Sequence, residues 1–135
     1  MRELLREKGY KATPARLAIL QVFSTTKKPL NAEAVCEKLH REGKKGINEV
    51  TVYRTLAHLE KGGILREVNL RKDSVFYELN NDHHHHIVCT NCETVEKFEN
   101  KDLEKVLGRI ALKLSKFKSI KEHSLEIFGL CRVCS

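Results

Sequence analysis

The sequence lacks the features of membrane, secreted and repeat proteins. No apolar run approaches the roughly 18–20 residues that a membrane-spanning helix needs, and the N-terminal segment carries too many charges for a secretory signal peptide. Internal repeats and low-complexity linkers are also missing. We therefore expect a cytoplasmic chain with no membrane partner, folded as one ordinary domain or as two very small ones.

The sequence also lacks the motifs of zinc enzymes and of phosphate-binding loops. It has no His-Glu-x-x-His, no His-x-Glu followed by Pro-Cys-x-x-Cys, and no glycine-rich phosphate loop. A zinc-dependent hydrolase or deaminase is therefore an alternative that the sequence disfavours, and we expect no enzymatic activity.

Positive charge is plentiful but unevenly placed. The 135 residues hold 25 Lys and Arg against 18 Asp and Glu, a formal net charge of +7. Residues 1–82 contribute 16 basic and 11 acidic side chains, and residues 83–135 contribute 9 and 7. A basic front half suits a polyanionic partner such as nucleic acid, because basic side chains displace counterions from phosphates. Charge alone favours the simpler alternative of a densely charged, solvated surface, so the motifs must decide.

Metal ligands are concentrated after residue 82, where four consecutive histidines precede two Cys-x-x-Cys pairs. A Cys at i and i+3 on a tight turn presents two thiolates to one ion, and two such turns complete a tetrahedral site with no open position. In a cytoplasmic chain these thiols favour zinc over the alternatives, a redox pair or two disulfides. The predicted ligands of this structural zinc are Cys89, Cys92, Cys131 and Cys134. Cys36 stands apart and is expected to be an ordinary buried thiol.

The histidine run predicts further metal sites. In an extended segment side chains alternate between two faces, so the rings at 83 and 85 point one way and those at 84 and 86 the other. One short strand can therefore serve two separate ions. A purification tag and a solvated polar loop are the alternatives, but tags are normally terminal and this run is embedded. The remaining candidate ligands, chosen partly on the resemblance described below, are Glu78, Glu104 and His123.

The first 80 residues show the order of elements of a winged helix-turn-helix. Three main helices are predicted to begin after the capping residues Thr13, Asn31 and Asn48, behind a short charged helix. Partial alternation over 64–70 and 75–79, with turn residues between them, predicts a hairpin. In such folds a recognition helix, here the third main one, enters the major groove of DNA. A small α+β domain without any ligand has the same pattern and is the alternative.

Exposed polar residues favour the DNA-binding interpretation. Three polar residues of the third main helix, Thr51, Arg54 and His58, share one side of it. Tyr53 lies on the flank of that side, where groove-reading side chains belong. The side chains that could contact phosphates around this helix are Arg16, Arg66, Arg71 and Lys72.

The segment after the histidines is predicted to form a second small module. Short strands are expected over 87–89, 94–98 and 124–128, with an amphipathic helix capped by Asn100 between the second and the third. One helix with so small a sheet leaves an edge and an apolar face poorly covered. Self-association would cover both.

Taken together, these motifs resemble the ferric uptake regulator family of bacterial metal-dependent repressors. The matching residues are Thr13-Pro14-Ala15-Arg16, Thr51-Val52-Tyr53-Arg54-Thr55-Leu56, the histidines before Cys89-x-x-Cys92, and His123-Ser124-Leu125 leading to Cys131-x-x-Cys134. The resemblance implies an α+β fold, with a winged helix-turn-helix DNA-binding domain over 1–80 and a small α/β metal-binding dimerisation domain over 81–135. It also implies that a homodimer carrying its regulatory metal binds a palindromic, AT-rich operator in double-stranded DNA and represses transcription.

The resemblance assigns roles to individual residues. Tyr53 would contact a base, and Arg16 and Arg54 would contact phosphates, with Thr51 in the same motif as Tyr53. The complete regulatory site, for iron(II) or zinc, maps onto His83, His85, Glu104 and His123. A second regulatory site, which is incomplete, maps onto Glu78, His84 and His86.

Two positions depart from the family pattern. The family often adds a histidine ligand just before the second main helix, but Pro29 occupies that position here, so the second regulatory site is short of a ligand. Lys97 stands where the peroxide-sensing branch of the family has an aspartate ligand, which argues against iron-catalysed peroxide sensing. A metal-storage or trafficking protein with no DNA role is the remaining alternative, and metal-dependent DNA binding would exclude it.

Overall fold

The chain forms two compact units in the computed structural model, which describes residues 1–44 and 46–135. The first unit spans Met1–Asp82 and the second spans His83–Ser135. Within the described residues, no helix combines the length and the apolar character that crossing a bilayer requires.

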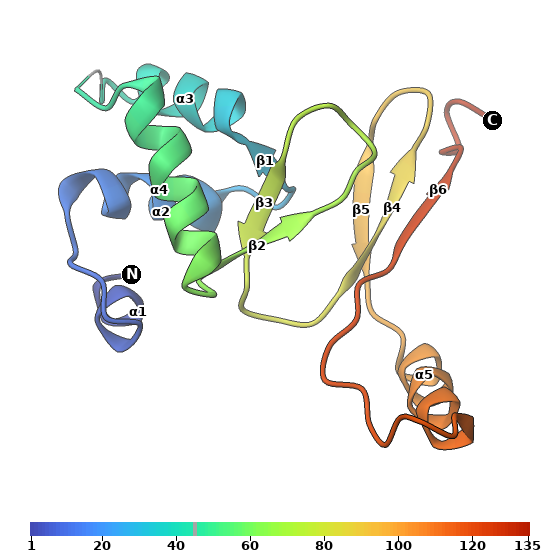
Figure 1. The fold of residues 1–135 in the computed structure, drawn as a ribbon. Helices are drawn as coiled ribbons and strands as arrows, with labels where there is room; N and C mark the ends of the chain where they lie inside the picture. The colour runs from blue at the N-terminus through green and yellow to red at the C-terminus, as the bar shows by residue number, and fades with distance from the viewer. Residues whose placement is uncertain (45) are drawn as a thin grey trace. The chain divides into compact units, whose positions relative to one another are not determined.

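The described residues of the first unit form the helices α1 (Arg2–Glu7), α2 (Pro14–Thr25), α3 (Ala32–Arg41) and α4 (Glu49–Lys61) (Figure 1). The three longer ones begin where the sequence predicts, because the side chain before each helix accepts a hydrogen bond from a backbone N–H of its first turn. The Thr13 hydroxyl accepts at 3.3 Å, and the side-chain oxygens of Asn31 and Asn48 each accept at 2.9 Å. The predicted helix starts are confirmed.

The sheet of the first unit has one strand more than the predicted hairpin. Strands β2 (Leu65–Val68) and β3 (Phe76–Leu79) pair antiparallel, as predicted. Strand β1 (Leu30–Asn31) pairs with the other edge of β3, which gives the order β1-β3-β2. A strand of two residues shows no alternation, so the sequence pattern could not predict it.

One apolar core joins these helices to the sheet. Val52, Leu56 and Leu59 of α4 are at most 1% exposed, whereas Tyr53 on the same helix is 54% exposed. The other core side chains that are at most 1% exposed are Leu5, Ile19, Leu20, Val22, Val35, Leu39 and Leu65. Helix α4 is therefore held by its apolar side and presents its polar side to solvent.

The second unit is a three-stranded sheet with one helix, which Figure 1 shows in yellow to red. Its central strand β4 (His85–Cys89) pairs antiparallel with β5 (Val95–Phe98) and parallel with β6 (Glu126–Gly129). Helix α5 (Lys101–Lys113) begins after Asn100, whose side-chain oxygen accepts from the Leu103 N–H at 3.0 Å, as predicted. Strand β4 begins two residues earlier than the predicted strand, so it includes the second half of the histidine run.

The apolar stripe of α5 is mostly exposed within this unit. Of its residues only Ala111 is buried, while Val106, Ile110 and the following Leu114 are 48%, 46% and 50% exposed. The amphipathic pattern was therefore predicted correctly, but the unit itself does not cover the apolar face.

Candidate metal centres and DNA-contacting residues

The four cysteines of the two Cys-x-x-Cys pairs lie together at one end of the second sheet. Strand β4 ends at Cys89, and its parallel partner β6 ends at Gly129, shortly before the second pair. All four Sγ atoms lie within 4.8 Å of one another. The Sγ atoms of Cys92 and Cys131, which are 39 positions apart in the sequence, are separated by 3.7 Å. The parallel register thus brings the two pairs to one point.

Local hydrogen bonds favour the thiolate form of two of these cysteines. The backbone N–H groups of Cys92 and Cys131 point at Cys89 Sγ from 3.5 and 3.4 Å and lower the pKa of Cys89 to about 6. The Thr94 side chain, 3.0 Å from Cys92 Sγ, lowers the pKa of Cys92. The thiolate is the form that binds metal. The four sulfurs, which converge within 4.8 Å of one another, fit a tetrahedral zinc ion.

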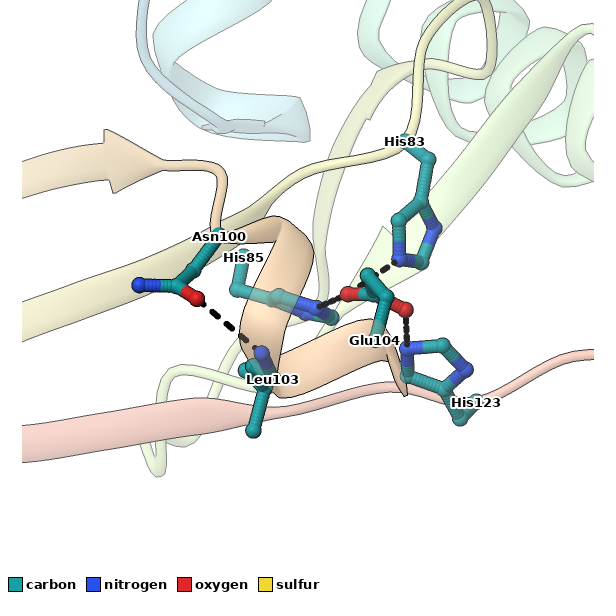
Figure 2. Close-up of polar contacts among 6 residues, drawn as sticks. All are labelled: His83, His85, Asn100, Leu103, Glu104 and His123. Carbon is teal, nitrogen blue, oxygen red and sulfur yellow. Dashed lines mark hydrogen bonds and ion pairs between the residues drawn. The ribbon is translucent and has the colours of Figure 1, made fainter. Parts of the chain in front are cut away.

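Three imidazoles and one carboxylate converge in the second cluster (Figure 2). The Nε2 atoms of His85 and His83 lie 2.7 and 3.0 Å from Glu104 Oε1, and His123 Nε2 lies 2.9 Å from Glu104 Oε2. Glu104 is in the first turn of α5, His85 is on β4, and His123 precedes β6. The sheet and the helix therefore each contribute ligands to one point, and His85 is only 1% exposed.

The polar contacts of this cluster are those of a charged site. The hydrogen bond from His85 is the largest cause that lowers the pKa of Glu104, followed by that from His83 and the charge of His123. His123 Nε2 is buried and has no well-directed hydrogen bond to any described residue. It lies at ion-pair distance from Glu104 Oε2. Donor nitrogens and carboxylate oxygens that point at a common centre in this way fit a divalent cation such as zinc or iron(II).

The other two histidines form a separate pair, as alternation along an extended segment predicts. The rings of His84 and His86 are 4.8 Å apart, and those of His83 and His85 are also 4.8 Å apart. Lys97 is opposite His86 in the β4–β5 register.

Glu78, the third predicted ligand of the second regulatory site, belongs to the first unit. It lies on β3 directly opposite Arg66 of β2, and Arg66 Nε donates a hydrogen bond to Glu78 Oε1 at 2.7 Å. The sequence identified Arg66 only as a possible phosphate contact and gave no sign of this pairing, which depends on the strand register. Pro29, at the position of the missing family ligand, is buried in the first unit.

The predicted DNA-contacting residues lie on the exposed side of α4 and at the start of α2. Tyr53 and Arg54 are exposed, while Thr51 is half-buried and its backbone N–H is the group that Asn48 caps. Arg16 is half-buried, and its guanidinium donates to the Lys11 carbonyl at 3.0 Å.

The sequence of this chain matches those of known proteins along most of its length. The model of the ferric uptake regulator family matches residues 7–128. The chain belongs to the ferric uptake regulator family. The ferric uptake regulation protein of Bordetella parapertussis is 38% identical over 132 residues, which are 96% of this chain and 93% of the relative. That of Neisseria meningitidis serogroup A is 37% identical, over 96% of this chain and 90% of the relative.

A solved structure of a family member has the same fold. The ferric uptake regulator from Francisella tularensis with iron superposes with a TM-score of 0.81 at 33% identity, over 93% of this chain and 95% of that one. The predicted α+β fold class, with a winged helix-turn-helix before a small α/β part, is confirmed. The family consists of metal-dependent, DNA-binding transcription regulators and not of enzymes, so this chain is a regulator of that kind.

Proposed function

We propose that this chain is a metal-responsive repressor that binds a palindromic operator as a homodimer when its regulatory metal is bound. The observation that carries this proposal is the cluster of His83, His85, Glu104 and His123, because three imidazoles and a carboxylate that share one centre form a complete ligand set. Residues 1–80 are the DNA-binding domain and residues 81–135 are the metal-binding dimerisation domain in this proposal.

The two clusters of the second unit have different tasks in this proposal. Cys89, Cys92, Cys131 and Cys134 would hold a structural zinc, since four sulfurs leave no open position on the ion. The histidine cluster would hold the exchangeable metal. Zinc and iron(II) both suit its nitrogen and oxygen donors, and the Francisella tularensis relative was solved with iron. Iron(II) or zinc is therefore the proposed regulatory metal.

A second regulatory site is proposed at Glu78, His84 and His86. Its support is the pairing of the two imidazoles on one side of the histidine run. With Pro29 at the family's usual ligand position, this site has three protein ligands, and its affinity for metal should be the lower of the two. The Glu78 carboxylate also holds Arg66, so a metal would share that carboxylate with a guanidinium.

DNA binding is assigned to four residues of the first unit. Tyr53 would contact a base in the major groove, with Thr51 beside it, and Arg16 and Arg54 would contact phosphates. Support comes from the side of α4 that carries Tyr53 and Arg54, which is exposed while the opposite side is buried.

The proposed mechanism is a shift of population between two arrangements of a dimer. Ligation at the histidine cluster would favour the arrangement that sets two α4 helices about 34 Å, one DNA turn, or a multiple of it apart. Only a difference in metal affinity between the two arrangements can move this equilibrium. The exposed apolar face of α5 supports self-association of the second unit.

The test compares two carboxylate substitutions in the first turn of α5. Glu104→Gln should weaken regulatory metal binding at least about tenfold, as loss of even an outer partner of a metal site does, and should weaken operator binding at a fixed metal concentration. Asp102→Asn removes the same charge from the same turn outside the cluster and should change neither. Metal content by elemental analysis and binding to an AT-rich palindromic duplex, titrated with iron(II), manganese, zinc or nickel, measure both.

The same titration separates a repressor from a storage protein. A chain that binds metal but binds the duplex equally with and without chelator would contradict the proposal. Tyr53→Ala should abolish duplex binding while leaving the bound zinc unchanged, and an unaltered duplex affinity would refute the assignment of α4 to the groove.

A further inference from the structure

The side chain of Tyr10 joins parts of the first unit that are far apart in the sequence. Tyr10 lies between α1 and α2, and its hydroxyl donates a hydrogen bond to the backbone carbonyl of His58 at 2.8 Å. The phenol ring also meets the His58 imidazole edge-on, with centroids 4.7 Å apart and an interplanar angle of 85°. His58 is in the last turn of α4, the helix that carries Tyr53 and Arg54. Tyr10 therefore holds the C-terminal end of the proposed recognition helix.

The end of α4 is shaped to receive this ring. Gly62 has φ −82°, which any residue can adopt, but a Cβ built on it would overlap the Tyr10 hydroxyl. The next residue, Gly63, has φ +78° and ends the helix with a hydrogen bond from its N–H to the Glu60 carbonyl at 3.0 Å. Gly63 is thus required by backbone conformation, whereas Gly62 leaves the space that Tyr10 fills.

The same ring holds Arg16. The guanidinium carbon of Arg16 lies 5.4 Å from the centroid of the Tyr10 ring, within the distance at which a cation is attracted to an aromatic face. Arg16 also donates to the carbonyl of Lys11, the residue after Tyr10. Tyr10 is therefore in contact with α4 and with a proposed phosphate ligand on α2 at the same time.

We propose that Tyr10 is a positioning residue for DNA binding, which fixes the Arg16 guanidinium relative to α4 before the operator arrives. The inference rests on the proposed phosphate contact of Arg16 and the proposed groove contact of α4. A side chain that is already ordered loses less conformational entropy on binding, so an ordered Arg16 guanidinium binds DNA more tightly. Tyr10 contributes to this affinity through Arg16 and needs no DNA contact of its own. No motif marks Tyr10 in the sequence, because the contact exists only in the folded unit.

The test is a double-mutant cycle on the full chain with its metals bound. Tyr10→Leu keeps apolar bulk but removes the hydroxyl and the aromatic face, and should weaken binding to an AT-rich palindromic duplex by about three- to tenfold. In an Arg16→Gln background the same substitution should change the affinity by less than about twofold, since coupled residues are not additive. Tyr10→Phe keeps the ring beside Arg16 and should give a smaller loss than Tyr10→Leu.

Salt dependence separates positioning from simple destabilisation. Arg16→Gln should reduce the slope of log affinity against log salt by about one, and Tyr10→Leu should reduce it in the same direction. Equal losses of affinity for Tyr10→Leu in both backgrounds would show that Tyr10 does not act through Arg16 and would overturn the inference. An Arg16→Gln variant with unchanged affinity and slope would instead overturn the phosphate contact, and this single variant identifies that failure.

Discussion

The two units of this chain are stabilised by different kinds of side chain. The first unit buries one continuous apolar cluster between α2, α3, α4 and its sheet. Among the described residues of the second unit, the buried side chains are Val88, Cys89, Ala111, His85 and His86. Three of these five are proposed metal ligands. The first unit is therefore stabilised by its own apolar core. The second unit needs bound metal and a partner surface for its stability.

Exposed apolar residues extend this contrast. Leu112, Ile127 and Leu130 of the second unit are 78%, 42% and 59% exposed, in addition to the uncovered face of α5. Fifty-odd residues can bury only a modest fraction of their surface, so such a module normally needs a metal, disulfides or a partner. A structural zinc and a dimer interface would together supply the stability that the small core of the second unit lacks.

The largest effect should come from breaking the sulfur cluster. Cys131→Ser removes one of four convergent thiols and should cost a large part of the zinc-binding free energy, which is on the order of 10 kcal/mol in all for structural zinc in small domains. We expect loss of zinc by elemental analysis and of amide protection across β4 to β6 by hydrogen exchange, while α2 to α4 stay protected.

Cys36→Ser is the control for that experiment. Cys36 is a half-buried thiol in the first unit whose pKa is raised, first by burial and then by Glu49 and Glu33. Its substitution should leave the zinc content unchanged. If Cys36→Ser and Cys131→Ser lost equal amounts of zinc, the assignment of the four ligands would be wrong.

A smaller effect, confined to the other unit, should follow from Leu56→Ala. Leu56 is 1% exposed in the core of the first unit, and truncation of such a side chain costs about 2–5 kcal/mol. All three tyrosines, Tyr10, Tyr53 and Tyr77, are in the first unit, so tyrosine fluorescence during denaturation reports its unfolding selectively. Zinc content should not change. If zinc were released at the same denaturant concentration as the midpoint of the fluorescence change, the two units would unfold as one.

What could be predicted from the sequence was local, and what could not depends on contacts across the fold. Thr13, Asn31 and Asn48 predicted three helix starts because a cap acts within three residues of itself. The spacing of the histidines predicted two ring pairs because side chains alternate between faces from one residue to the next, which is also a local property. Strand β1 was missed, because two residues become a strand only when β3 lies beside them.

The candidate sites show the same division. Residue types and spacing predicted the cysteines and the histidine run as ligands, whereas Glu104 and His123 were chosen partly on the family resemblance. Only the fold shows that Glu104 faces three imidazoles at once. The pairing of Arg66 with Glu78 and the contact of Tyr10 with Gly62 were not predictable, since each joins residues on separate elements. Such contacts leave no periodicity in the sequence.

Two glycines give the smallest and most closely matched comparison of the units. Gly108 lies inside α5, and a Cβ built there meets nothing within 4 Å, so Gly108→Ala should stabilise the second unit by about 1 kcal/mol. Gly62→Ala should instead destabilise the first unit by about 1–3 kcal/mol, because the added methyl group meets the Tyr10 ring. The change in the free energy of unfolding is measured by tyrosine fluorescence during denaturation for the first unit. Hydrogen exchange measures it for the second unit. In a Tyr10→Leu background the cost of Gly62→Ala should largely disappear, and a cost that persists would mean that Gly62 is needed for the α4 terminus itself and not for Tyr10.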